Sequence, residues 1–394
     1  MTAIMKGVRV LEVSEHGFLP MAGALLADWG AEVIKIEPVE RGDAARGITT
    51  TGDDVNVLFE HANRGKQSLA LDLAQSEARE ILYRLAASAD VFMTNKLPRV
   101  RAKLKLDVED LRAHNPRLIY ARGGGAGEKG PERDRGSYDL LSFWHRTGVS
   151  SMVARPDGSL PFLPAPGFGD FTGAMFIAGG VMGALFHRER TGEATVVDSS
   201  LLATGMWSMG AAIACADRDP AWPWPPPQAN PLSATYYTAD DRRIALCCLQ
   251  AAHYWPMMCE AIGRPELGRD PRFATQDRLL GNAEAATILR EAFAAHSLAE
   301  WRVKLETFPG QWNVVQTAAE VPSDPMVEPN GYLQRVETAA GVPFRLVAAP
   351  IQYDGVPARP GRAPEFNEHG DAILEGLGLD WDAVVDLKVR GIVG

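Results

Sequence analysis

One aspartate, Asp170, stands in a short glycine-rich stretch, Gly167 to Gly173 (GFGDFTG), directly before a long apolar run. We expect the run from Ala174 to Arg190 to form a buried helix with Asp170 at its N-cap. Its several glycines each cost ~1 kcal/mol relative to alanine, which indicates that neighbouring backbone packs closely against it. Unpaired N–H groups at a helix start favour an ionised carboxylate. Such a carboxylate in an apolar pocket can attack an activated acyl group, although capping alone also explains an aspartate here.

Five cations gather within ten residues, directly after a strand expected at Val91 to Met93; they are Lys96, Arg99, Arg101, Lys103 and Lys105. Ligands of open α/β sheets bind at the carboxyl ends of strands. The whole chain is acidic, with 40 Lys and Arg against 50 Asp and Glu and a net charge of −10, which argues against a general nucleic-acid binder. A concentrated positive site in such a protein suits a phosphate-bearing ligand, while a solvated helix face would explain the same charges without one.

A glycine-rich loop, Gly125 to Gly130 (GAGEKG), has the spacing of a dinucleotide-binding fingerprint. That fingerprint needs its third glycine inside a starting helix, whereas Pro131 and the charged Glu132 to Arg135 come next. We therefore interpret this segment as an ordinary loop.

Composition predicts a globular protein with a sizeable core, since 46% of the 394 residues are hydrophobic and 23% are charged. The four cysteines lack metal-ligand spacing and read as buried free thiols, so we expect no metal site. No basic flank with an apolar segment marks a secretory signal, and no run reaches the ~18 apolar residues of a membrane span. We expect a cytoplasmic protein without a membrane partner.

The elements that must position these residues alternate between strand and helix. We expect strands at Val8 to Val13, Val33 to Ile36, Ser68 to Leu73, Val91 to Met93 and Leu118 to Ala121, and helices at Pro20 to Trp29, Gln75 to Ala87 and Val108 to His114. This alternation predicts an α/β fold with a parallel sheet and helices on both faces.

The chain changes character after Thr204. A stiff segment with three consecutive prolines precedes a two-stranded pattern, Ala234 to Thr238 and Ile244 to Leu249, and helices at His253 to Ile262, Ala283 to Ala295 and Leu298 to Leu305. Extended segments at Val342 to Leu346 and Ala348 to Ile351 follow, and a helical pattern runs from Asp371 to Leu377. The middle part is therefore predicted to be a small α+β domain.

An ordered set of motifs along nearly the whole chain resembles the class III CoA-transferases, the family of formyl-CoA:oxalate and carnitine CoA-transferases. The similar stretches include Ala24 to Pro38 (ALLADWGAEVIKIEP), Asn63 to Lys66 (NRGK), Asn115 to Tyr120 (NPRLIY), Tyr138-Asp139, Gly169-Asp170, Val196 to Leu202 (VVDSSLL) and Gly376 to Leu379 (GLGL). The resemblance implies a Rossmann-like large domain built from both chain ends (1–215 and 321–394), a linker (216–231), a small α+β domain (232–320), and a homodimer with interlocked chains.

The resemblance also implies functional residues. Asp170 matches the family's catalytic nucleophile, and coenzyme A would lie near Leu71, Asp72, Leu73, Asn95, Lys96, Leu97, Lys103, Ser137, Tyr138 and Asp139. The implied reaction moves CoA from an acyl-CoA to a carboxylic acid through an anhydride and a thioester of the aspartate, without ATP or metal. Backbone N–H groups near Gly169 and Gly173 would hold the developing oxyanion.

Two alternatives stay open. α-Methylacyl-CoA racemases resemble the chain at Asp170 but carry His at the position of Tyr138, and the nearby His145 reads as a structural histidine. The second alternative is a protein that binds CoA but catalyses no reaction.

Three departures from the family pattern concern the site. Glu15 to Leu19 replaces a polar CoA-binding stretch, Pro38 stands where some relatives have arginine, and a glycine-rich lid has no counterpart. The segment Trp222 to Pro231 lies near the position of that lid in the sequence. Trp144, Trp207 and Trp224 could form the walls of a pocket for a larger, apolar acyl group.

Overall fold

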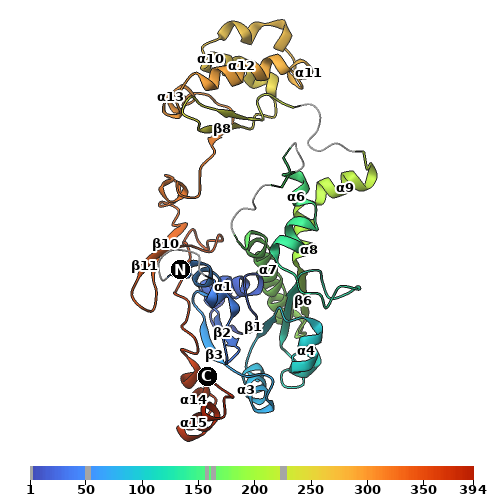
Figure 1. Cartoon of the computed structure of the whole chain (residues 1–394), viewed down its shortest axis with the longest axis vertical. Helices are drawn as coiled ribbons and strands as arrows, with labels where there is room; N and C mark the ends of the chain where they lie inside the picture. Colours follow the sequence, from blue (N-terminus) through green and yellow to red (C-terminus); the bar gives the residue numbers. More distant parts are fainter. Residues whose placement is uncertain (1–2, 49–54, 156–158, 161–165, 222–228) are drawn as a thin grey trace. The chain divides into compact units, whose positions relative to one another are not determined.

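The computed structural model describes residues 3–48, 55–155, 159–160, 166–221 and 229–394. The chain forms two compact units, of which the first comprises Met1–Ala214 and Pro325–Gly394 and the second Cys215–Asp324. Figure 1 follows the chain through both units, coloured along the sequence. Residues from both ends of the sequence therefore build the first unit.

A six-stranded sheet lies at the centre of the first unit. All its strands are parallel, in the order β3-β2-β1-β4-β5-β6. The strands are β1 (Arg9–Val13), β2 (Glu32–Glu37), β3 (Gln67–Ala70), β4 (Val91–Thr94), β5 (Ile119–Gly124) and β6 (Val196–Ser200). This is the strand order of doubly wound Rossmann sheets, in which a ligand crevice opens where the order reverses, between β1 and β4. The predicted α/β class is confirmed, although β6 was not expected.

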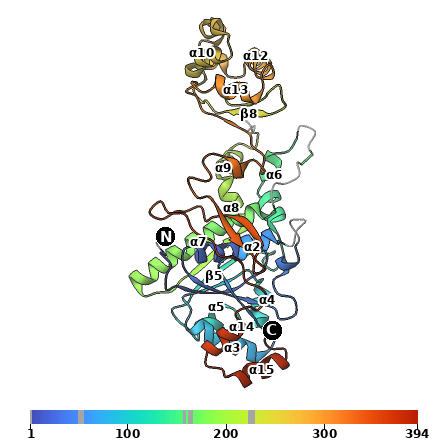
Figure 2. The same ribbon diagram turned by 90° about the vertical axis from the view of Figure 1, so that its left-hand side faces the viewer.

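Helices cover both faces of this sheet, as Figure 2 shows for α7 on one side and α3, α5, α14 and α15 on the other. Val10 and Val91 face one core with α1 (Phe18–Asp28) and α7 (Phe168–Thr191). Their neighbours Leu11 and Phe92 face the other core, with α3 (Ser76–Ala87), α5 (Val108–Arg112), α14 (Gly370–Gly376) and α15 (Trp381–Val389). Side chains alternate along a strand, so strands buried on both faces read as continuous apolar runs.

Shorter elements complete the first unit. They are η1 (Ala44–Gly47), α2 (Val57–Asn63), α4 (Pro98–Leu104), a π-helix η2 (Leu140–His145), α6 (Val149–Met152), α8 (Leu201–Ser208) and α9 (Gly210–Arg218), which continues into the second unit. β10 (Leu333–Glu337) and β11 (Pro343–Val347) pair antiparallel. Ala348 to Ile351, expected to be extended, is not part of a strand.

The C-terminal segment closes the β3 edge of the sheet. Leu71 forms an antiparallel bridge with Val393, and the Asp72 N–H donates to the Ile392 carbonyl at 3.0 Å. The Ala70 N–H donates to Asn367 Oδ1 at 2.8 Å. These bonds satisfy backbone groups that an edge strand would otherwise expose.

The second unit has a small antiparallel sheet, in the order β7-β8-β9. Its elements are β7 (Thr235–Tyr237), β8 (Arg243–Leu246), α10 (Ala251–Ala261), η3 (Pro265–Arg269), η4 (Pro271–Phe273), α11 (Gln276–Leu279), α12 (Ala283–Ala294), α13 (Leu298–Lys304), β9 (Trp312–Val314) and η5 (Val321–Ser323). Trp255, Phe293 and Trp301 fill its core. Cys248 and Cys259 are buried free thiols as expected, but Cys247 is exposed and Cys215 half-buried.

The helix α7 begins earlier than the sequence suggested. Gly167, in a left-handed conformation with φ of 78°, is its N-cap, and Asp170 is the third residue inside the helix. The expectation that Asp170 is the N-cap is therefore wrong. Glycine alone adopts this left-handed turn without strain, so the chain enters the helix two residues before Asp170.

Side chains, and not backbone, pack closely on α7. A Cβ at Gly173 would lie 2.7 Å from the Phe18 ring of α1, and one at Gly180 would lie 2.6 Å from Val197 of β6. Gly179 and Gly183 face open space instead. The prediction that neighbouring backbone packs closely against this helix is therefore wrong at these glycines.

Within the described residues, α7 is also the one helix whose length and hydropathy would allow it to cross a membrane. Core helices of globular proteins meet the same two criteria, and one face of α7 lies in the core beside α1.

Candidate active site

A cavity of about 350 Å³ opens at the carboxyl ends of the central strands and reaches Asp170. The residues after β1 (Glu15 to Phe18), after β4 (Asn95 to Leu97) and at the end of β5 (Gly123 to Gly125) line it, together with Ser137 and Tyr138. The strand order reverses at this point of the sheet, where ligands of doubly wound folds bind. Its volume is in the range of small-molecule sites.

The starts of two helices meet at Asp170. Asp170 belongs to the first turn of α7, and α1 begins at Phe18 directly after its N-cap Gly17. A Cβ at Gly17 would lie only 2.5 Å from Asp170 Oδ2, so only glycine allows the backbone to come this close. The first N–H groups of any helix lack intrahelical partners, and helix starts of this kind favour negative charge.

Asp139 takes the capping role that Asp170 was expected to have. Gly169, the second residue of α7, donates its N–H to Asp139 Oδ1 at 3.1 Å and to Oδ2 at 3.2 Å. Gly167 has no side chain with which to cap the helix, so a residue thirty positions earlier supplies the acceptor. The Gly169 N–H is therefore occupied, and our expectation that it faces an oxyanion is wrong.

The pKa of Asp170 is raised to about 7, first by burial and second by the charge of Asp139. We had expected the helix start to favour the ionised form, but the loss of solvation outweighs it. Burial also raises the pKa of Asp139, against the opposing effects of the Gly169 N–H and the Trp144 side chain. Two neighbouring carboxyl groups with raised pKa values are typical of functional sites.

A second cavity, of about 300 Å³, adjoins the first along the strand ends. Leu71, Asp72 and Leu73 after β3 line it, with Ile36 to Glu40 at the end of β2 and just after it, and Gly391 from the C-terminal segment. Glu15 and Lys96 line both cavities, and their side chains form an ion pair. This ion pair therefore stands where the two cavities meet.

The residues predicted to contact CoA fall into four groups. Leu71, Asp72 and Leu73 line the second cavity, and Asn95, Leu97, Ser137 and Tyr138 line the Asp170 cavity. Lys96 belongs to both. Lys103 is exposed on α4, and Asp139 faces the start of α7.

The five cations do not form one patch. Arg101 is buried and pairs with Asp107 at 2.9 Å and with Glu128 of the glycine-rich loop. Lys96 pairs with Glu15, whereas Arg99, Lys103 and Lys105 are exposed. Arg101 therefore fixes a loop and is not available to a ligand.

Sequence reasoning missed the importance of His16 and Gly17, which it treated only as a departure from a family pattern. His16 has a left-handed backbone with φ of 70°, a conformation that costs a non-glycine residue about 1–2 kcal/mol. Its ring meets the edge of Tyr138 at 5.3 Å between centroids, in the Asp170 cavity. The position of both residues directly after a central strand was the signal that could have identified them.

Other candidates lie away from this cavity. His145 Nδ1 is 2.7 Å from Ser150 Oγ, which agrees with the structural interpretation. Trp144 is buried against Phe168, and Trp207 lies beside Phe176 in a separate groove. Trp224 lies outside the described residues. Neither Trp144 nor Trp207 lines the Asp170 cavity. The described residues hold no cluster of His, Cys, Asp and Glu suited to a metal ion.

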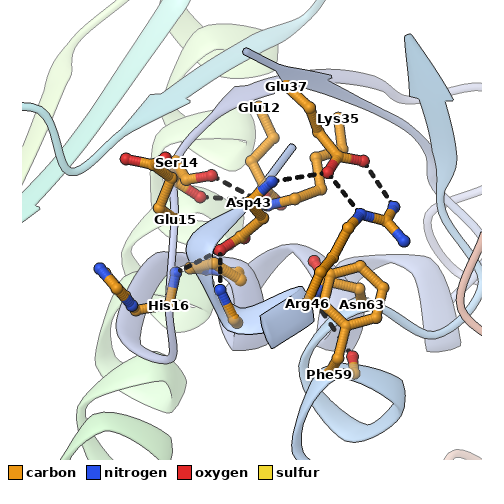
Figure 3. Close-up of polar contacts among 12 residues, drawn as sticks. Glu12, Ser14, Glu15, His16, Lys35, Glu37, Asp43, Arg46, Phe59 and Asn63 are labelled. Atoms are coloured by element: carbon orange, nitrogen blue, oxygen red, sulfur yellow. Dashed lines mark hydrogen bonds and ion pairs between the residues drawn. The ribbon is translucent and has the colours of Figure 1, made fainter. Parts of the chain in front are cut away.

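A buried polar network lies beneath the turn at His16 (Figure 3). Lys35 of β2 forms ion pairs with Asp43 at 2.8 Å and with Glu12 at 3.1 Å, and all three side chains are fully buried. Burial opposes the ionisation of Asp43, but Lys35 and two backbone N–H groups outweigh it and hold the pKa of Asp43 below its usual range. Asp43 is therefore a charged acceptor inside the protein.

Comparison with known proteins identifies the family. The model of CoA-transferase family III matches residues 5–370. The chain belongs to CoA-transferase family III. This class III CoA-transferase is 31% identical over 399 residues to the (R)-2-hydroxy-4-methylpentanoate CoA-transferase of Clostridioides difficile, covering 99% of both chains. It is 28% identical to the cinnamoyl-CoA:phenyllactate CoA-transferase of Clostridium sporogenes, covering 98% of this chain and 96% of the relative.

Solved structures agree with this assignment. The crystal structure of Rv3272 from Mycobacterium tuberculosis matches the class III CoA-transferase with a TM-score of 0.81 and 31% identity, covering 93% of this chain and 98% of the other. A CAIB/BAIF family protein from Brucella suis has a TM-score of 0.81 and 28% identity, covering 96% and 100%. The resemblance stated from the motifs is confirmed at full length.

Proposed function

We propose that this class III CoA-transferase moves CoA from an acyl-CoA donor to a free carboxylic acid, with Asp170 as the nucleophile. The observation that carries the proposal is the place of Asp170, whose carboxylate meets a cavity at the carboxyl ends of the central strands and lies against the start of α1. A carboxylate in this position is accessible to a thioester and flanked by helix starts that favour developing negative charge.

The reaction proceeds by acyl exchange on one carboxyl group. The Asp170 carboxylate attacks the donor thioester, the carbon–sulfur bond breaks, and a mixed anhydride and CoA thiolate result. The thiolate attacks the aspartyl carbonyl, which releases the donor acid as its carboxylate and leaves an aspartyl-CoA thioester. An acceptor carboxylate repeats the two steps in reverse and frees Asp170. Every step exchanges one acyl bond for another, so no energy-rich co-substrate is consumed.

The two adjoining cavities suit a long substrate such as CoA. We infer that the end of CoA remote from the sulfur binds in the cavity at Leu71 to Leu73 and that the thioester binds beside Asp170. Lys96 lines both cavities and provides a cation for phosphate, provided that it leaves Glu15. Asn95, Leu97, Ser137 and Tyr138 would then contact the part that leads to the thioester.

Mass spectrometry tests the role of Asp170. After incubation with acetyl-, succinyl- or cinnamoyl-CoA, wild type should carry a hydroxylamine-sensitive CoA adduct on Asp170, and Asp170→Ala should carry none. Asp382→Asn is a matched control, since Asp382 is also in the first turn of a helix, α15. An adduct in Asp170→Ala would contradict the proposal. The absence of both adduct and acyl exchange in wild type would favour a CoA-binding protein without catalysis.

The acyl group is proposed to be larger and more apolar than formyl or oxalyl. Phe18, Leu97, Val100 and Leu201 line the Asp170 cavity, and two relatives are named for branched or aromatic acids. A screen of acids that discharge the adduct should therefore favour branched or aromatic acceptors. Oxalate or formate as the best acceptor would contradict this assignment.

Proton exchange at the α-carbon of the acyl group is a second candidate activity, because His16 lines the same cavity as Asp170. Such exchange needs two acid–base groups near one carbon. Incorporation of deuterium into the α-position of an acyl-CoA without any acceptor acid would favour it over CoA transfer.

We also propose a homodimer with interlocked chains. Phe176 of α7 and Trp207 of α8 are exposed and line an apolar groove on the first unit, as expected of a surface covered by a second chain. Light scattering after size-exclusion chromatography should give twice the mass of one chain, and a monomer would contradict the proposal.

A further inference from the structure

We propose that Asp43 is a positioning residue: together with Lys35, it holds His16 in its left-handed conformation and thereby fixes the backbone of Gly17 against the Asp170 carboxylate. The role rests on the proposed function of Asp170 as nucleophile. Asp43 lies in the loop after β2 and lines neither of the two cavities, so it would act through the turn and not through contact with substrate.

Two hydrogen bonds from the polar network hold the turn from both sides. Asp43 Oδ1 accepts the His16 N–H at 3.0 Å, and Lys35 Nζ donates to the Ser14 carbonyl at 2.9 Å. The φ of His16 is 70°, and a residue with a side chain keeps such an angle only where its surroundings enforce it. Asp43 and Lys35 bond the backbone on the two sides of Glu15, while Asn95 accepts the Glu15 N–H at 3.1 Å and donates to the Glu15 carbonyl at 2.6 Å.

The two holding groups are themselves fixed. Lys35 and Asp43 form a fully buried ion pair of 2.8 Å, and Asp43 Oδ1 also accepts the Ala45 N–H at 2.9 Å. The Asp43 N–H donates to Glu37 Oε2 at 2.8 Å. Figure 3 shows these contacts converging on Asp43 from β2 and from the loop that follows it. With so many fixed partners, Asp43 cannot shift without losing bonds, and a rigid second layer keeps reacting groups in place.

The turn positions the start of α1 beside the nucleophile. Gly17 follows His16 and is the N-cap of α1, and its Cα leaves no room for a Cβ beside Asp170 Oδ2. A change in the conformation of His16 would therefore move the backbone that touches the reacting carboxylate. Displacements of ~1 Å at a reacting group can slow a reaction about a hundredfold.

Removal of Asp43 should slow the covalent step more than it weakens CoA binding. In Asp43→Ala, the rate at which the adduct forms on Asp170 in a single turnover should fall at least about tenfold, with the Kd for CoA changed by less than about threefold. Asp43→Asn retains an oxygen that can accept the His16 N–H and should recover part of the rate. Glu60→Gln is the control, because Glu60 is a buried carboxylate that likewise accepts a backbone N–H, from Ala363 at 2.7 Å. If Asp43 only stabilised the fold, Asp43→Ala would lower Tm without changing the ratio of the adduct-formation rate to the Kd for CoA.

A pair of variants at His16 tests the backbone conformation itself and does not depend on Asp43→Ala folding. His16→Asn and His16→Val both remove the imidazole, but asparagine tolerates the left-handed region and a β-branched residue does not. Adduct formation in His16→Val should be at least about tenfold slower than in His16→Asn. Equal rates in the two variants, or a rate in Asp43→Ala within about threefold of wild type, would overturn the role of Asp43. If wild type forms no adduct with any acyl-CoA, the proposed function fails first.

Discussion

Asp170 combines two properties that oppose one another. A carboxylate of higher pKa is the better nucleophile, but burial and Asp139 hold the pKa of Asp170 near 7, so part of the population carries a proton at neutral pH. Reactivity at this residue is thus a compromise between basicity and the ionised fraction.

The rate of adduct formation should rise with pH and level off above a midpoint near 7, because only ionised Asp170 attacks. Asp139→Asn removes the second cause of the raised pKa and keeps an oxygen for the Gly169 N–H. Its midpoint should move to lower pH but stay above the ordinary value of 3.8, since burial is the larger cause. Single-turnover rates across pH 5 to 9 measure both profiles. A midpoint that is unchanged or higher in Asp139→Asn would contradict this explanation.

Stability should change with pH in the opposite direction to the rate. Between pH values of about 4 and 7, the folded protein keeps a proton on Asp170 that the unfolded chain has lost, so stability falls as pH rises and the full penalty applies above 7. The complete difference in pKa corresponds to ~4 kcal/mol, and partial solvent screening reduces it to about 2 kcal/mol. Asp170→Asn should therefore raise Tm by a few degrees at pH 8 and hardly at pH 4. An equal change at both pH values would exclude ionisation as the cause.

At the scale of elements, two glycine-to-alanine variants distinguish the effect of close packing on α7 from the effect of helix propensity. Gly180→Ala would force a Cβ to within 2.6 Å of Val197, and overpacking of this kind costs ~1–3 kcal/mol. Gly376→Ala at the end of α14 meets open space and should be neutral or stabilise by up to about 1 kcal/mol. Denaturant unfolding of the two variants compares them. If both variants lowered the free energy of unfolding by a similar amount, the cause would be the change in backbone conformational freedom and not the contact with Val197.

The strand and helix pattern of the first half could be predicted because strands buried on both faces are short apolar runs between helical periods. β6 was missed because its second half, Asp198 to Ser200, is polar. α15 was missed because only Val384 of its residues is fully buried, so its apolar face is weak.

The site was predictable only in part, for a physical reason. Asp170 stands out because glycines surround it just before an apolar helix. The partnership of Asp139 with Gly169 joins residues far apart in sequence, and it depends on where the π-helix and α7 come to lie. The same holds for Asp43 and His16, whose contact exists only after the sheet has formed. Such pairings carry no local sequence signal.

At the scale of the first unit, the C-terminal segment supports the second cavity as well as the sheet edge. Asn367 accepts the Ala70 N–H at 2.8 Å and donates to the Gly394 carbonyl, and Gly391 lines the cavity with Leu71. Both ends of the chain therefore shape the proposed CoA site.

Asn367→Ala should lower stability by ~1–3 kcal/mol, because it leaves the Ala70 N–H without its acceptor. It should also weaken CoA binding more than it slows acyl transfer within the bound complex, since the second cavity lies away from Asp170. Calorimetric titration with CoA and single-turnover rates separate the two effects. Asn330→Ala, which removes a half-buried side chain that donates to the Met326 carbonyl, is the control. Unchanged CoA affinity in Asn367→Ala would remove this segment from the binding site.

The bond between Ala70 and Asn367 joins residues 297 positions apart, which has a consequence during synthesis on the ribosome. At ~5–20 residues per second, the β3 edge waits roughly 15–60 s for its partner to be made. During that interval the ribosome produces all of the second unit, Cys215–Asp324, which can fold through its own contacts while the nascent first unit still exposes an open strand. An unprotected edge of this kind invites pairing with other chains. The nascent protein should therefore depend on chaperones until its last segment emerges, and slower translation would lengthen that dependence.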